Sequence, residues 1–167
     1  MNTDRTKKIS RTGLLLAATL ILQGLRLFLP MPPQISMFLI GALVNACLVI
    51  AVLHVGWRAG IVVACVTPVF AWLEGMLPFM PFIFPVAAGN TAFIMAIWIL
   101  KKYGLPGVCG AAVIKAAAIY GAFYMLFGCV TFPDAVRHMI LLVMSWPQIV
   151  TAIIGGLLGY VIIKRIQ

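Results

Sequence analysis

The sequence predicts an all-α membrane protein, with six transmembrane helices in a single compact bundle. Of its 167 residues, 64% are hydrophobic and only 9% are charged, and the mean hydropathy is +1.16. Soluble domains are about half apolar and about a quarter charged, so this composition lies outside that class. Apolar runs of about 20 residues, the length that crosses a bilayer core, recur along nearly the whole chain. We therefore expect residues 1–167 to form one transmembrane domain.

The first three spans are predicted over residues 12–29, 35–54 and 57–76. A basic segment precedes the first span, as in a signal peptide, but the apolar run continues to Leu29 without a small-x-small cleavage site. We therefore expect an uncleaved helix. The prolines of residues 30–33 end the first span, and Gly56 ends the second. Inside the third, Pro68 leaves the carbonyl of Ala64 without its usual donor and predicts a kink.

The last three spans are predicted over residues 81–100, 105–130 and 137–163. Several prolines between Pro78 and Pro85 make the start of the fourth span the least defined boundary. Gly104 separates the fourth span from the fifth, and the turn residues 131–134 separate the fifth from the sixth. Pro147 predicts a second kink, inside the sixth span.

Basic residues fall mainly on one side of the predicted bundle. Only Arg26 and Arg137 belong to the side away from the termini. Because Lys and Arg are enriched in cytoplasmic segments, both termini of this multi-pass chain are expected in the cytoplasm. The net charge of +9 is therefore interpreted as membrane orientation, not as nucleic-acid binding. The side of the termini carries Arg5, Lys7, Lys8, Arg11, Arg58, Lys101, Lys102, Lys164 and Arg165.

Three charged side chains fall within predicted spans, where each costs roughly 2.5–3.5 kcal/mol near the bilayer centre on insertion scales. Arg26 either extends to the outer headgroups or contacts a ligand. Glu74, the only acidic residue in a span, either pairs with Arg26 or Lys115 or binds substrate. Lys115 lies closer to the midplane and should face the bundle interior, against a buried partner or a bound anion.

Further polar and aromatic residues are predicted in the outer half, beside the proline-rich loop. Asn45, Asn90 and Gln148 are predicted to join helices by hydrogen bonds, and Asn90 and Gln148 are also candidates to contact a ligand. Tyr124 and Trp146 offer stacking faces, so we expect a small, partly aromatic ligand. Its charge stays open, because both signs of charge belong to the predicted pocket. The predicted substrate-binding residues are Arg26, Glu74, Asn90, Lys115, Tyr124, Trp146 and Gln148.

Pairs of small residues four positions apart recur in the inner half of the spans. Such pairs let helices approach closely, within one chain or against a partner. Their positions are Gly13-x3-Ala17, Ala42-x3-Ala46, Ala112-x3-Ala116 and Gly155-x3-Gly159.

The sequence contains few features that would indicate an enzyme or a metal site. There is no GxxxxGK[ST] motif, so the chain has no P-loop with which to hydrolyse a nucleotide. His54 and His138 lie on opposite sides of the predicted membrane, and the four cysteines form no CxxC pair. Each cysteine is expected to act as a small buried hydrophobe. We expect no enzymatic activity, no metal and no cofactor.

The chain resembles the substrate-binding S component of an energy-coupling factor (ECF) transporter. Three features carry the resemblance: six helices in under 200 residues with both ends inside, the basic-flanked first helix with Gly13-x3-Ala17, and a stretch from Leu73 to Phe82 leading into Gly89-Asn90. Members of that family often carry Ala-x3-Ala where this chain has Gly13 and Ala17.

The resemblance implies a division of labour between subunits. The S component captures a vitamin or a related micronutrient from outside. A separate transmembrane coupling subunit binds its small-residue inner face, here Gly13 and Ala17, and two ABC ATPase subunits supply the energy. The lipid bilayer is the remaining partner.

Two other functions stay open. A self-sufficient secondary transporter or channel would need a coupling-ion site or a polar path across the whole membrane, and Lys115 is the main feature in its favour. A non-transport scaffold protein would make the outer polar residues structural, and replacing Glu74 and Trp146 would then leave its function unchanged.

Overall fold

The computed structural model describes residues 2–29 and 31–166, and these fold into helices joined by short loops, with no strand among them. By length and composition, five helical segments can cross a membrane, and α3 is an apolar helix that is slightly shorter. The chain is therefore a multi-pass helical membrane protein. Its main helices are α1 (Asn2–Phe28), α2 (Pro33–Ile50), α3 (Trp57–Leu73), α4 (Ile83–Leu100), α5 (Leu105–Cys129), α6 (Asp134–Val143) and α7 (Trp146–Ile166). Short turns of other helix types are η1 (Ala51–Val55), η2 (Met80–Phe82) and η3 (Lys101–Tyr103).

A helix is confirmed at each of the six predicted spans, with three differences in extent. Helix α3 ends at Leu73 rather than at residue 76, so Glu74 lies just after the helix and not within the span. The first helix begins at Asn2 rather than at residue 12, because its basic segment contains neither glycine nor proline to end it. The sixth span is divided into α6 and α7, so the kink predicted there is a complete break. Pro147, in the first turn of α7, has no N–H with which to continue a helix from α6.

Close packing of α2 against α7 forms the centre of the bundle, and α4 packs along α5. A Cβ atom added at Gly155 would collide with the carbonyl oxygen of Ala42, and one at Gly159 would lie 2.7 Å from that of Ala46. The small-residue pairs of α2 and α7 therefore hold this chain together rather than facing a partner.

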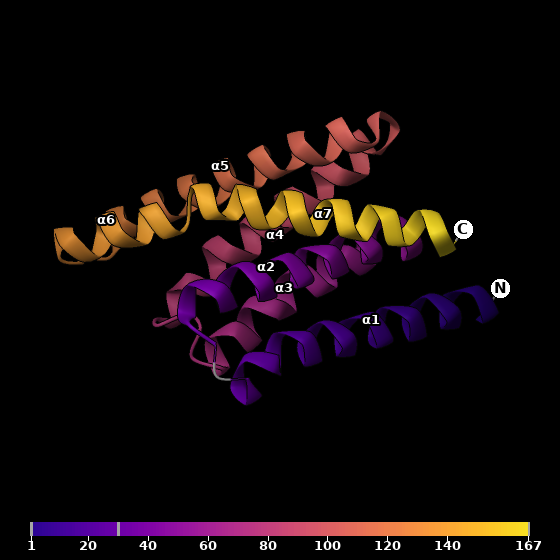
Figure 1. Cartoon of the computed structure of the whole chain (residues 1–167), viewed down its shortest axis with the longest axis horizontal. Helices are drawn as coiled ribbons and strands as arrows, with labels where there is room; N and C mark the ends of the chain where they lie inside the picture. The colour runs from indigo at the N-terminus through magenta and orange to yellow at the C-terminus, as the bar shows by residue number, and fades with distance from the viewer. Residues whose placement is uncertain (1, 30, 167) are drawn as a thin grey trace.

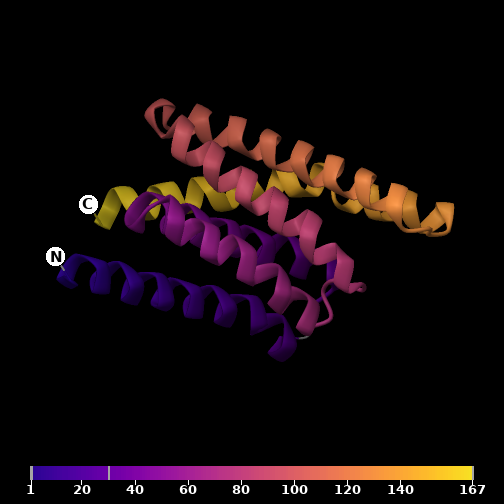
Figure 2. The same ribbon diagram turned by 180° about the vertical axis from the view of Figure 1, so that it is seen from behind.

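Both termini lie at the same end of the bundle (Figure 1). The opposite end carries the α1–α2 connection, the loop between α3 and α4, and α6. Helix α1 lies at the edge of the bundle, as the reverse view also shows (Figure 2). Its outward face remains open, since a Cβ added at Gly13 would meet nothing within 4 Å and Ala17 is exposed.

The phenylalanines of the α3–α4 loop pack into an aromatic cluster between α4, α5 and α6. Phe82 is fully buried and meets Phe123 edge-to-face, with ring centroids 5.0 Å apart. Phe79 and Phe127 each meet Phe132 in the same manner, at 5.3 and 5.4 Å. Edge-to-face contacts of this kind fix ring orientation, so these side chains anchor the loop.

Candidate functional site

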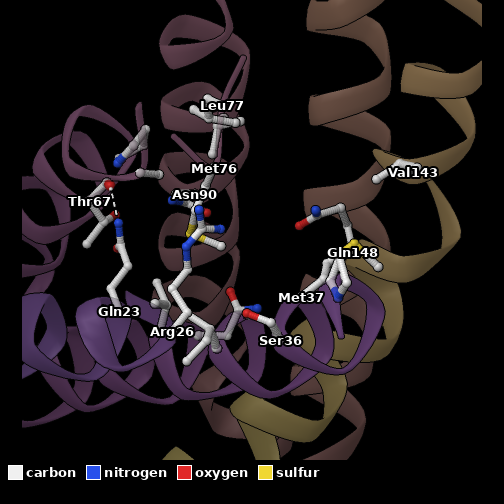
Figure 3. A pocket seen from close by; sticks show the side chains of 18 of the residues that line it. Gln23, Arg26, Ser36, Met37, Thr67, Met76, Leu77, Asn90, Val143 and Gln148 are labelled. Carbon is white, nitrogen blue, oxygen red and sulfur yellow. Dashed lines mark hydrogen bonds between the residues drawn. The ribbon is translucent and has the colours of Figure 1, made fainter. Parts of the chain in front are cut away.

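A partly enclosed cavity of about 760 Å³ lies in the half of the bundle away from the termini. Its wall comes from the C-terminal ends of α1 and α3, the N-terminal halves of α2 and α4, the middle of α5 and the α6–α7 break. Small-molecule sites commonly measure roughly 300–1,000 Å³ and bring a few polar groups into an apolar wall. The cavity has the size and position of a ligand site (Figure 3).

The wall combines polar side chains with a flexible apolar surface. No aromatic ring lines the cavity among the residues that the structure describes. Four methionines, which adapt readily to ligand shape, form much of the apolar surface: Met31, Met37, Met76 and Met144. The polar groups come from Gln23, Arg26, Ser36, Asn45, Thr67, Asn90, Lys115 and Gln148.

A helix C-cap positions the loop that closes one side of the cavity. Gly75 has a φ of +73°, in the left-handed region that glycine adopts without strain. Its N–H donates to the carbonyl of Trp72 at 3.0 Å, and the N–H of Met76 donates to that of Ala71 at 2.7 Å. This pair of bonds is a Schellman motif, which ends α3 and turns Met76 onto the cavity.

The break between α6 and α7 supplies the opposite wall. The Ser145 hydroxyl donates to the carbonyl of Leu142 at 2.8 Å, and its own carbonyl accepts the N–H of Gln148 at 3.1 Å. These bonds end α6 and begin α7. As a result, Met144 and Gln148 line the cavity from adjacent turns.

Lys115 enters the cavity wall as a buried cation. Only 3% of the residue is exposed, and its Nζ donates to Asn45 Oδ1 at 2.5 Å. The Asn45 amide in turn donates to Thr151 Oγ1 at 3.4 Å, which links α5, α2 and α7. Phe93 presents its ring 5.3 Å from the ammonium. Asn45 therefore joins helices by hydrogen bonds, as predicted, and also orients Lys115.

Arg26 and Glu74 meet through the main chain. Arg26 Nη2 donates to the Glu74 carbonyl at 2.9 Å, which ties α1 to the loop after α3. Gln23, one turn before Arg26, donates to the carbonyl of Thr67 at 3.2 Å. No ion pair within 4.0 Å joins Glu74 to Arg26 or Lys115 in the described part of the chain, where only Arg137 and Asp134 form one.

Replacing Arg26 with alanine is expected to lower the free energy of unfolding by about 1–2 kcal/mol, because a partly buried charged hydrogen bond is lost. Thermal unfolding in detergent measures this loss. Glu74→Gln is the matched control, since it leaves the accepting carbonyl in place and should cost less. An equal loss in both variants would mean that the carboxylate, not the carbonyl, holds Arg26.

The structure gathers four of the seven predicted binding residues: Arg26, Asn90, Lys115 and Gln148 line the cavity. The Glu74 side chain lies beside the cavity but not in its wall.

Tyr124 and Trp146 do not join the cavity wall, and they are 64% and 54% exposed. Tyr124 follows the buried Phe123, so the helical turn directs it to the outer face of α5. Trp146 lies just after the helix break and packs on Phe38, with ring centroids 5.9 Å apart. Neither ring therefore provides a stacking face in the wall of this cavity.

Three polar residues of the cavity wall were not predicted from the sequence: Gln23, Ser36 and Thr67. Gln23 carried a usable signal, because it precedes Arg26 by three positions and so shares its helix face. Ser36 follows the prolines that begin α2, and its Oγ is a buried atom without a hydrogen-bond partner. A serine at such a position gives no signal in the sequence that distinguishes it from a helix-capping residue.

The cysteines differ from expectation in burial. Cys47 is buried, but Cys65, Cys109 and Cys129 are exposed on the outside of the bundle. The prediction of four buried cysteines is wrong for these three. No group of three or more His, Cys, Asp or Glu residues in the described chain could hold a metal ion.

No family model, curated protein or solved structure matches this chain. Its function is inferred from the cavity, which offers amide and hydroxyl groups and two cations in an apolar wall. Such a wall can bind and orient a small polar molecule.

Proposed function

We propose that this chain is the substrate-binding S component of an ECF-type importer in the bacterial plasma membrane. It captures a vitamin or related micronutrient from outside the cell. The cavity of about 760 Å³, placed in the half of the bundle opposite the termini, is the observation that carries this proposal.

The orientation of the cavity follows from the charges at the two ends of the bundle. Nine of the 12 lysines and arginines belong to the end that carries the termini. Under the positive-inside rule this end is cytoplasmic. The cavity then belongs to the outer half, where it can take a ligand from outside.

Transport by this scheme needs partners, because the chain contains no P-loop. The open face of α1 supports a partner contact, since Gly13 and Ala17 are exposed there while the small residues of α2 and α7 are used internally. Small exposed residues four positions apart allow a second helix to approach closely. A transmembrane coupling subunit, joined to two ABC ATPase subunits, is the proposed partner of this face.

Replacing Gly13 and Ala17 together with leucine is expected to reduce co-purification of the two ATPase subunits on the order of tenfold, because the larger side chains hold the helices apart. Quantitative mass spectrometry of the tagged chain, purified from its own membranes, measures the loss. The control replaces Gly121 and Gly128 with leucine, because a Cβ at either meets nothing within 4 Å. Undiminished co-purification with the Gly13 and Ala17 variant would remove α1 as the coupling face.

The second candidate function is that of a self-sufficient secondary transporter. Lys115 favours it, because an intramembrane cation that lines a cavity can couple binding to an ion gradient. Proteoliposomes that contain only this chain distinguish the two functions. Gradient-driven uptake of the compound extracted from the purified protein would favour the secondary transporter, and uptake that requires ATPase subunits would favour the S component.

A further inference from the structure

The acidic residues of the chain leave Lys115 without a counter-charge. The sequence contains only three acids, Asp4, Glu74 and Asp134. Asp134 pairs with Arg137 at 3.6 Å, and Asp4 lies in the first turn of α1, at the end of the bundle away from the cavity. Glu74 forms no ion pair with Lys115 within 4.0 Å in the described part of the chain. Lys115 is therefore a buried cation of the cavity wall that pairs with no carboxylate in the described part of the chain.

The groups that surround Lys115 compensate only part of the cost of its burial. Its ammonium carries three donors, and one of them is used on Asn45 Oδ1. The Phe93 ring, 5.3 Å away, adds a weaker attraction. Burial of an ion carries a large penalty unless an opposite charge with good hydrogen bonds accompanies it. An anion that enters the cavity would supply both.

A second polar group in the wall of the same cavity is available to a ligand. Ser36 lines the same cavity and is 6% exposed, and its Oγ has no hydrogen-bond partner. Buried polar atoms are almost always paired in native proteins. A polar group on a bound molecule would satisfy this hydroxyl.

We infer that the cavity binds a small organic anion with a single carboxylate, which pairs with the Lys115 ammonium beside Asn45. A second polar group of the same molecule meets Ser36, and its apolar part lies against the methionines of the wall. This inference rests on the proposed capture of a small molecule by the cavity. A monoanion matches the single Lys115 ammonium, whereas a phosphate dianion would also need the Arg26 guanidinium, which is held at the Glu74 carbonyl.

The test is the composition of the small molecules that solvent releases from the detergent-purified chain, measured by mass spectrometry. The native chain is expected to carry a carboxylic acid. Lys115→Met should lose it on the order of a hundredfold, because the buried charge pair is removed. Lys115→Arg keeps the charge and should retain more of the compound. Lys102→Met is the matched control, since Lys102 is exposed at the end that carries the termini and lies outside the cavity wall.

Folding of the variants is checked by their melting temperatures without ligand. Lys115→Met is expected to melt no lower than the native chain, because it removes an unbalanced buried charge at similar volume. Lys115→Gln, which can still donate to Asn45, replaces it if the methionine variant does not fold.

Each outcome bears on a different claim. A neutral or cationic compound in the native chain, or an acid retained at native level by the Lys115→Met variant, would overturn the carboxylate inference and leave capture standing. A native chain that releases no compound would overturn the proposed capture, and the inference with it.

Discussion

Replacing Gly155 with alanine is expected to destabilise the protein by about 3 kcal/mol, at the upper end of the usual cost of overpacking. The added methyl group would collide with the carbonyl oxygen of Ala42 and would lie 2.7 Å from the Asn45 Cβ. The Ala42 oxygen is a backbone atom and the Asn45 Cβ is bonded directly to the backbone. A change of side-chain rotamer therefore cannot move either atom away. Relief requires α2 and α7 to separate along the contact that forms the centre of the bundle.

Thermal unfolding followed by circular dichroism in detergent measures this effect. Gly121→Ala is the matched control, because it makes the same substitution in a helix where the new Cβ meets nothing within 4 Å. That variant should be neutral or gain up to about 1 kcal/mol from the better helix propensity of alanine. Equal melting temperatures for the two variants would show that α2 and α7 do not approach as closely as described.

Replacing Ser36 with tryptophan is expected to lower ligand occupancy by more than about tenfold, which corresponds to about 1.4 kcal/mol of binding free energy. Ser36 lies in the wall of the cavity, and an indole there would occupy space that a ligand needs. The quantity to measure is the amount of small molecule released from equal amounts of purified protein.

The neighbouring residue supplies the control for this substitution. Ile35 is 56% exposed and lies outside the cavity wall, so Ile35→Trp adds the same bulk to the outer face of α2. We expect it to keep native occupancy. Occupancy that survives the Ser36→Trp substitution would place the ligand somewhere other than this cavity.

The position of each helix was predictable because the signals for it are local. The length of an apolar run, the glycine at 56 or 104 and the prolines of residues 30–33 all act within one or two turns. The break between α6 and α7 was less predictable. Pro147 indicates a disturbed helix, but whether the helix bends or stops depends on hydrogen bonds such as that from Ser145 to Leu142.

The binding residues were only partly predictable, because nearly uniform apolar helices do not reveal which face is turned inward. Depth along a helix identified Arg26, Asn90, Lys115 and Gln148, since buried polar groups in membranes are expensive. The orientation of α5 about its own axis turns Tyr124 away from the cavity. No pattern of polar residues along α5 predicts that orientation. In the same way, the Gly155-x3-Gly159 pattern alone could not distinguish a contact within the chain from a surface that binds a partner.

The sequence by itself determined the class of protein, its helices and the unequal distribution of basic residues, since these depend on composition and local order along the chain. Only the tertiary structure decided which charges share the cavity. The sequence placed Arg26, Glu74 and Lys115 together and left the sign of the ligand open. In the folded chain Arg26 binds the Glu74 carbonyl, and Lys115 lines the cavity without an acidic partner within 4.0 Å. The difference arises because charge compensation depends on distances between helices, which hydropathy along one chain does not specify.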